Sequence, residues 1–198
     1  KDYIGFFKQQ RTGAVEIDVD QGRDDLSVIS VPCECVAFVM GAGGQTLRLM
    51  EGEWRTLMFF AKGRAGDGAE GTEMLVIFGE LRARRGAEMK VMSAIEHKRP
   101  GTFITDGRLT TQRRVRGDDD PAGFRTDTIP LEADEFSYAL GKGGSTRRKL
   151  ASASGCVLEY VGHTACLTGW KVERQRARDY LRWLLKQRHG SMTVDTSG

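Results

Sequence analysis

Hydrophobic and polar residues alternate along two segments near the start of the chain, 14–19 and 26–31. This spacing predicts two β-strands, because successive side chains of a strand point to opposite faces. Apolar residues at helical spacing follow in 33–40, and 45–51 is also helical in composition. The glycine-rich segment 41–44 separates these two predicted helices.

Two short apolar runs and a long amphipathic segment come next. The runs 57–60 and 74–78 predict strands, and the charged segment 80–98 predicts a helix. Between the two strands, 62–71 holds four glycines among charged residues, which predicts a flexible loop. The predicted order from residue 26 is therefore strand, helix, glycine loop, helix, strand, strand and helix.

The same order returns in the second half of the chain. We predict a strand at 124–129, helices at 132–140 and from 145, strands at 156–161 and 165–168, and a helix at 170–189. The glycine loops begin at residues 41 and 141, and the strands before the last helices end at Gly79 and Gly169. Two copies of one βααββα unit are the main feature of this sequence, and they predict an α+β fold.

This repeat divides the chain into five segments. We expect an N-terminal extension with an extra strand at 1–23, a first domain at 24–99, a linker at 100–123, a second domain at 124–190 and a tail at 191–198.

Charge is distributed unevenly between the two copies, although the formal net charge of the chain is only +3. Residues 141–190 hold 11 Lys and Arg against 3 Asp and Glu, a net of +8, whereas residues 24–97 hold 8 against 11, a net of −3. A basic second half predicts a polyanionic partner, and nucleic acid before membrane, because no amphipathic anchor accompanies it.

Composition and sequence motifs also exclude several classes of segment and site. No run approaches the length of a membrane span, and no signal-peptide pattern opens the chain. The four cysteines are few for 198 residues and are typical of reduced thiols in the cytoplasm or nucleus. Cys33 and Cys35 have no neighbouring CxxC pair or His pair, so the sequence predicts no metal site and no cofactor. An enzyme is the least supported class, since no catalytic triad or specific carboxylate pair is present.

The glycine loop Gly141-Lys142-Gly143-Gly144 directly precedes a basic helix. Glycine permits positive φ and lets another backbone come close. The N–H groups at the start of a helix attract anions. This local pattern predicts a grip on a phosphate backbone.

Both glycine loops belong to a longer pattern of apolar residues and glycines. The first copy carries it in full, at Met40, Gly41, Gly44, Leu47 and Met50, and the second carries it at Leu140, Gly141, Gly144 and Leu150, with Arg147 at the position of Leu47. An apolar-x-Gly sequence then leads into each last helix, as Ile77-Phe78-Gly79 and Leu167-Thr168-Gly169. Over 24–98 and 124–190 the chain thereby resembles tandem type I KH domains, as in vigilin-like multi-KH proteins.

The resemblance implies a three-stranded antiparallel sheet packed on three helices in each copy, and binding of single-stranded RNA or DNA. KH domains clamp about four nucleotides of backbone against the GxxG loop. In the second copy the implied contacts are Gly141, Lys142, Gly143, Gly144, Arg147, Arg148, Leu140, Leu158 and Tyr160, beside Phe136. In the first copy they are Gly41, Ala42, Gly43, Gly44, Arg48 and Leu47.

The two loops differ in charge, so we expect RNA to bind chiefly to the second copy. Lys142, with Arg147, Arg148 and Lys149 behind it, offers cations to phosphates, whereas the first loop has Ala42 and is followed by Glu51 and Glu53. Arg147, where the family groove is apolar, predicts a base contact by guanidinium stacking or hydrogen bonding. One alternative stays open, a scaffold that contacts protein partners through the acidic first copy or the C-terminal helix, where Trp183 and Leu185 lie off the core face.

Overall fold

The computed structural model describes residues 17, 23–61, 71–106, 108–110, 123–188 and 190. The chain divides into two compact units, residues 1–88 and 89–198, and the division falls inside helix α4 (Leu81–Lys98). The five segments expected from the sequence remain a prediction. The strand expected at 14–19 lies outside the described residues except for Ile17, as does nearly all of the loop at 62–71.

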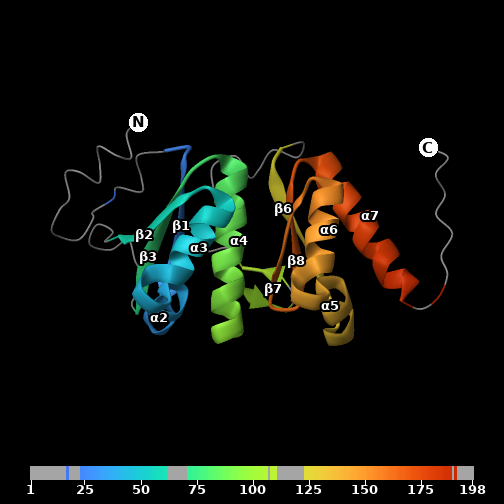
Figure 1. The fold of residues 1–198 in the computed structure, drawn as a ribbon, viewed down its shortest axis with the longest axis horizontal. Coiled ribbons are helices and arrows are strands. Elements are labelled where there is room, and N and C mark those ends of the chain that lie inside the picture. Colours follow the sequence, from blue (N-terminus) through green and yellow to red (C-terminus); the bar gives the residue numbers. More distant parts are fainter. Residues whose placement is uncertain are drawn as a thin grey trace. The chain divides into compact units, whose positions relative to one another are not determined.

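The first unit is built around a three-stranded antiparallel sheet in the order β1-β3-β2 (Figure 1). Its elements are β1 (Leu26–Pro32), α2 (Cys33–Met40), a short 3-10 turn η1 (Ala42–Gly44), α3 (Gln45–Trp54), β2 (Leu57–Ala61) and β3 (Thr72–Phe78), and α4 begins after it. Helix α2 packs on β1 and α3 packs on β2. The edge strands of this sheet are β1 and β2.

Both faces of this first sheet are apolar. Alternation along β1 and β3 buries Ile29, Val31, Leu75 and Ile77 on one face. The opposite face carries a second cluster made of Leu26, Phe59, Met74, Val76 and Phe78, and Ile17 packs on it. The N-terminal extension thus contributes at least one core side chain to the first unit.

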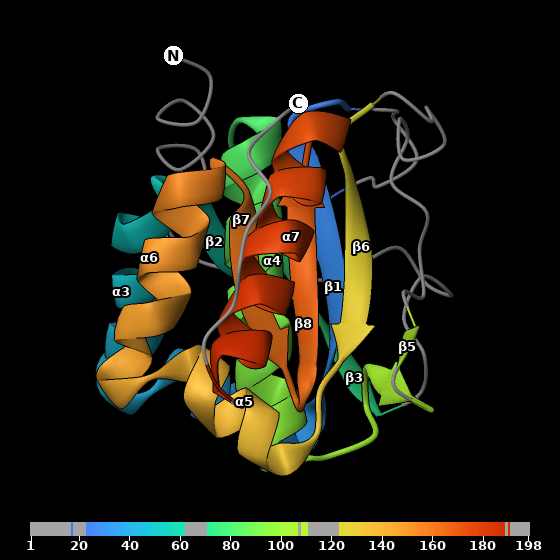
Figure 2. The ribbon, with the colours of Figure 1, turned by 90° about the vertical axis from the view of Figure 1, so that its right-hand side faces the viewer.

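The second unit repeats this architecture in the strand order β6-β8-β7. Its elements are β6 (Arg125–Pro130), α5 (Ala133–Leu140), the turn η2 (Lys142–Gly144), α6 (Ser145–Ser154), β7 (Val157–Val161), β8 (Thr164–Gly169) and α7 (Lys171–Gln187). Figure 2 shows α5, α6 and α7 together on one face of the sheet. The predicted fold class, α+β with two βααββα units that each contain a three-stranded antiparallel sheet, is confirmed.

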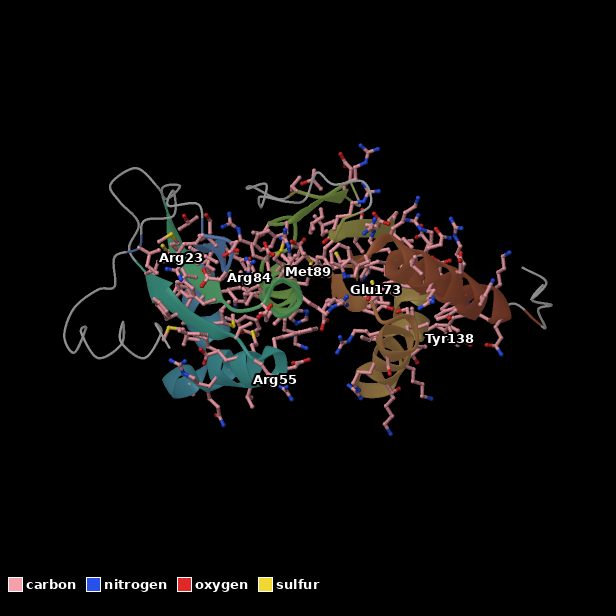
Figure 3. The ribbon with its side chains drawn as sticks, turned by 90° about the horizontal axis from the view of Figure 1, so that it is seen from above. Arg23, Arg55, Arg84, Met89, Tyr138 and Glu173 are labelled. Atoms are coloured by element: carbon pink, nitrogen blue, oxygen red, sulfur yellow. The ribbon has the colours of Figure 1, made fainter. Side chains whose placement is uncertain are left out.

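A buried arginine occupies the same place in each unit, five residues after the glycine that ends the last strand. Arg84 and Arg174 are each 2% exposed, and Arg84 is labelled in Figure 3. Arg84 donates to the Gly79 carbonyl at 2.8 Å and to Ser27 Oγ at 3.0 Å. Arg174 donates to the Gly169 carbonyl, and its Nε lies 3.1 Å from Asp127 Oδ2.

These two guanidinium groups tie the start of the last helix to the first strand of each unit. Burial is the main reason that the pKa of Arg84 lies below its ordinary value. The sequence contains no local signal for this role, because it depends on carbonyl groups that only the folded chain brings together.

One element of the linker is absent from the sequence-based prediction. Strands β4 (Ile104–Thr105) and β5 (Arg108–Leu109) form a small antiparallel hairpin. Phe103 before it is buried, and its carbonyl accepts hydrogen bonds from the backbone and side chain of Thr110. Strands of two residues are too short to leave a periodic pattern in the sequence.

Candidate nucleic-acid interface

The two glycine loops have nearly the same backbone conformation. Gly41 and Gly141 have φ of 70° and 69°, and Gly43 and Gly143 have φ of 59° and 57°. A Cβ at Gly41 would lie 2.1 Å from Thr46 Oγ1, and one at Gly141 would lie 2.2 Å from Thr146 Oγ1. The first glycine of each loop is therefore required by sterics as well as by its positive φ.

Each loop closes on itself and leads directly into a helix. The Gly44 N–H donates to the Gly41 carbonyl at 3.2 Å, and the Gly144 N–H donates to the Gly141 carbonyl at 3.0 Å. No side chain caps the N-terminus of α3 or α6 in the described part of the chain. Uncapped N–H groups at a helix start can bind the oxygen atoms of an anion.

Cationic side chains surround the second loop. Lys142 and Lys149 are exposed, and Lys142 makes no hydrogen bond or ion pair to any residue that the structure describes. Arg148 donates from Nη1 to the Gly143 carbonyl at 2.7 Å, across the loop. Arg148 thus braces the loop, while Lys142 projects from it into solvent.

Arg147 is held against the edge strand of the second sheet. Its Nη1 donates to the Leu158 carbonyl at 3.0 Å and lies 2.5 Å from Glu159 Oε1. The Arg147 side chain is 12% exposed. The sequence-based expectation of a base contact by Arg147 remains a prediction, and one of its two terminal nitrogens already has protein partners.

A cavity of about 840 Å³ lies beside the second loop within residues 89–198. Six predicted site residues line it, namely Leu140, Gly143, Gly144, Arg147, Arg148 and Tyr160. Leu158 lies instead in the core cluster and is 1% exposed, and Gly141 and Lys142 are not among the lining residues. The structure thus brings six of the nine site residues predicted for the second copy together around one cavity.

Aromatic rings form part of the lining of this cavity. Phe136 meets Tyr160 edge to face with centroids 5.3 Å apart, and it stacks on His163 with centroids 4.9 Å apart. Tyr160 is 4% exposed, and its hydroxyl has no hydrogen-bond partner among the described residues. Burial raises the pKa of Tyr160 above its ordinary value, so the hydroxyl stays protonated.

Several lining residues were not predicted from the sequence. They are Glu159 from β7, Gly162 and His163 from the turn between β7 and β8, and Lys90, Ser93, Glu96, His97, Pro100 and Ile104. Residues 90–104 are far from the second loop in sequence, and no sequence motif marks them as part of its site.

The corresponding site in the first unit has the opposite charge at its sheet edge. Leu47 is 3% exposed and packs inward, as its apolar character predicts. Glu51 Oε1 accepts the backbone N–H of Met58 at 2.6 Å, and Arg48 forms an ion pair with the same carboxylate. Ala42 and Gly43 are exposed, so the first loop presents backbone groups and no cation of its own.

Other kinds of site are not evident in the described parts of the chain. No group of three or more His, Cys, Asp or Glu side chains is placed to hold a metal ion in these parts. No described helix has the length and apolarity that crossing a membrane requires.

No family model matches the sequence, and no curated protein matches it. Among solved structures, the chain is similar to Dim2p from Pyrococcus horikoshii, at 15% identity and a TM-score of 0.38 over 82% of this chain and 91% of that one. A complex of a/eIF2alpha, aDim2p and rRNA from the same organism gives 16% identity and a TM-score of 0.37, over 81% and 85% of the two chains.

The first type I KH domain of human vigilin is similar to part of the chain. The match has 14% identity and a TM-score of 0.31, and it covers 50% of this chain and all of that domain. At TM-scores below 0.5 these likenesses do not indicate a function for the chain.

Proposed function

We propose that this chain binds single-stranded RNA without catalysing a reaction, and that it does so chiefly through the second unit. The observation that carries the proposal is one cavity lined both by the glycine loop, at Gly143 and Gly144, and by the aromatic rings of Phe136 and Tyr160. Proteins bind single-stranded nucleic acids through contacts to the phosphate backbone and through stacking of the bases on aromatic side chains, and residues suited to both line this cavity.

The phosphate side of the proposed site comes from the loop and from helix α6. Lys142 and Lys149 are exposed cations at the loop and in the helix that follows it. No side chain caps the N-terminus of α6 in the described part of the chain, and its first N–H, from Ser145, donates to the Lys142 carbonyl. Because each neutralised phosphate releases counterions, these cations would give RNA binding a marked dependence on salt.

The base side of the proposed site comes from the cavity. Phe136 and His163 stack on each other and offer their remaining ring surfaces to a nucleobase, while the Tyr160 hydroxyl is buried and lacks a described protein partner. Stacking of a base on an aromatic side chain contributes about 1–3 kcal/mol. Two stacked bases, together with phosphate contacts at the loop 141–144, would give a modest affinity for a short single strand.

The first unit supports a second function, contact with a protein partner. Its glycine loop has Ala42 in place of Lys142 and so offers no cation to a phosphate backbone. Three large apolar side chains of α2 and α3 are exposed, with Phe38 at 43%, Met40 at 37% and Leu49 at 68%. Exposed apolar side chains on neighbouring helices are typical of a protein contact. The helix α7, with Trp183 at 37% exposure, is the other candidate surface.

Matched loop variants test the RNA-binding proposal. The double variant Lys142→Asp with Gly143→Asp places two carboxylates at the second loop, and Ala42→Asp with Gly43→Asp does the same at the first. A Cβ at Gly43 or Gly143 meets no atom within 4 Å, and Asp tolerates positive φ better than most residues. Both variants are therefore expected to fold, which circular dichroism would verify.

Binding to a randomised RNA pool would be measured by fluorescence anisotropy, with single-stranded DNA of the same length as competitor. We expect the second-loop variant to lose at least about tenfold in affinity, since it removes one cation and adds two anions. The first-loop variant is expected to lose less than about threefold. If the second-loop variant stays folded and keeps full affinity, that loop is not the clamp, and if neither variant weakens binding, the scaffold function is favoured.

A further inference from the structure

The cavity beside the second glycine loop has two walls from distant parts of the chain. One wall comes from α5, α6 and β7, and includes Phe136, Arg147 and Tyr160. The other comes from the end of α4 and the segment after it, through Lys90, Ser93, Glu96, His97, Pro100 and Ile104. All of these residues belong to the unit 89–198.

The second wall is anchored by a buried carboxylate. Glu96 is 5% exposed and accepts hydrogen bonds from the backbone N–H groups of Gly101, at 2.6 Å, and Phe103, at 2.7 Å. These bonds fix the turn by which the chain leaves α4. A charge-assisted hydrogen bond of this kind is stronger than a neutral one, so the wall from α4 to Ile104 is held in one arrangement.

The turn between β7 and β8 is short enough for the residues from Lys90 to Ile104 to line the cavity. That turn consists of only Gly162 and His163, so it leaves the space beside the sheet edge open. A Cβ at Gly162, which has φ of 56°, would lie 3.4 Å from Glu96 Cγ and 4.0 Å from Ile104 Cγ1. The end of α4 and the hairpin strand β4 therefore lie directly against the short turn.

A carboxylate in the cavity lies between two cationic side chains, one from each wall. Lys90 Nζ lies 3.9 Å from Glu159 Oε1, and Arg147 Nη1 lies 2.5 Å from the same oxygen. The Lys90 side chain is 32% exposed, whereas Glu159 is 5% exposed. The hollow thus has an amine donor on one wall, a guanidinium donor on the other and a carboxylate acceptor between them. A nucleobase edge presents the complementary set of carbonyl oxygens, ring nitrogens and exocyclic amines.

We propose that residues 89–104 form the second wall of the RNA groove, and that Lys90 and His97 determine which base the groove accepts. This inference rests on the proposed function of the second loop and adds base selection by a segment outside the GxxG region. The loop would hold the phosphates, and the two walls would enclose one or two bases. A volume of about 840 Å³ is within the range of sites that enclose a small ligand.

Two lysines of α4 provide the test. Lys90→Ala removes a cation that lines the cavity, and Lys98→Ala removes an exposed cation of the same helix that does not line it. Affinities for poly(A), poly(C), poly(G) and poly(U) of equal length would be measured for each full-length variant. His97→Ala provides an independent change on the same wall.

We expect Lys90→Ala to weaken the preferred homopolymer by about five- to tenfold and to alter the ranking of the four bases, because a specific base contact is lost. Lys98→Ala should weaken all four by the same factor, less than about threefold, because it only lowers the general positive charge. Equal and uniform losses in Lys90→Ala and Lys98→Ala, with no change of ranking in His97→Ala, would overturn the inference.

Photo-cross-linking of the unmodified chain adds a readout that needs no mutation. RNA carrying 4-thiouridine should cross-link to peptides within 89–104 as well as within 136–163. Cross-links confined to 136–163 would exclude the second wall.

The loop double variant of Lys142 and Gly143 separates the two proposals. If that variant loses affinity while the wall variants leave base ranking unchanged, only the further inference fails. If the loop variant binds RNA normally, the proposed function itself fails.

Discussion

Glu51 caps the edge strand of the first sheet, where its carboxylate accepts the backbone N–H of Met58 at 2.6 Å. In the second unit Ala151 stands at the position of Glu51, and Arg147 caps the corresponding strand by donating to the Leu158 carbonyl. In both units a helix side chain therefore hydrogen-bonds to a backbone group of the edge strand. The side chain is a carboxylate in the first unit, paired with Arg48, and a guanidinium in the second, paired with Glu159. We assign the RNA to the second unit because of the cavity beside its glycine loop and the exposed cation Lys142.

The Glu51 contact leads to a prediction for stability. Glu51→Ala leaves the Met58 N–H without its acceptor, so we expect the free energy of unfolding to fall by about 1–3 kcal/mol. Urea denaturation measures it. Glu73→Ala, at an exposed strand position, is the matched control and should change stability by less than about 0.5 kcal/mol. Equal effects of the two changes would contradict a capping role for Glu51.

The glycines of the second loop should differ in their tolerance of a side chain. Gly141→Ala brings a Cβ to 2.2 Å from Thr146 Oγ1, whereas Gly143→Ala meets no atom within 4 Å. Both changes carry the cost of positive φ, about 1–2 kcal/mol. We expect Gly141→Ala to cost at least about 1 kcal/mol more, because the clash requires the loop or Thr146 to move. Thermal unfolding of the two variants, in the same buffer, makes the comparison, and similar melting temperatures would count against it.

Arg174 supports a further stability prediction. It is buried and joins the Gly123 carbonyl, at 3.0 Å, to the Gly169 carbonyl and Asp127. Arg174→Leu leaves the Gly123 and Gly169 carbonyls without this donor, whereas Asp127 keeps its ion pair with Arg178 at 2.9 Å. A buried acceptor that loses its donor costs about 1–3 kcal/mol. Arg176→Ala, at an exposed position of the same helix, controls for the loss of one positive charge. Urea denaturation should show a large loss of stability only in the first variant.

The salt dependence of RNA binding reports how many phosphates the protein neutralises. If Lys142 neutralises one phosphate, Lys142→Ala should lower the slope of log K against log salt concentration by about 0.7 in magnitude. The measurement is a titration of RNA binding between low and physiological salt. An unchanged slope in Lys142→Ala would mean that the lysine lies away from the backbone.

The four cysteines should differ in reactivity in the native state. Cys33 is exposed, whereas Cys35, Cys156 and Cys166 are buried. Burial raises the pKa of Cys166 from 9.0 to about 12, so its thiol stays protonated at neutral pH and is a poor nucleophile. A thiol reagent at pH 7.5 should label one cysteine rapidly and all four only after denaturation. Rapid native labelling of Cys166 would contradict its burial.

The raised pKa of Cys166 also predicts that the free energy of unfolding depends on pH. Because the folded-state pKa of Cys166 is higher than the unfolded one, its contribution is fully present below about pH 9 and is lost as pH rises toward about 12. Cys166→Ser, which removes the titrating group, should make the decline of the unfolding free energy over this range shallower. An identical decline in both proteins would assign it to other groups.

Much of the fold could be predicted from local patterns. The strands near 26–31 and 74–78, the helices on either side of each glycine loop and the repeat itself follow from periodicity and from glycine placement, because these signals act over a few residues. The hairpin of β4 and β5 escaped prediction because strands of two residues carry no period. The division of the chain inside α4 also has no sequence signal, since a continuous helix shows no break in its pattern.

The sequence by itself determined the two βααββα copies, the positions of the glycine loops and the contrast in charge between Lys142 and Ala42. All of these depend on residues that are neighbours in the chain. Only the tertiary structure decided that Arg147 and Glu51 cap sheet edges, that Leu158 belongs to the core, and that Lys90 lies across a cavity from Phe136. Those relationships join residues that are distant in sequence, and side-chain packing, rather than any local pattern, sets which of them meet.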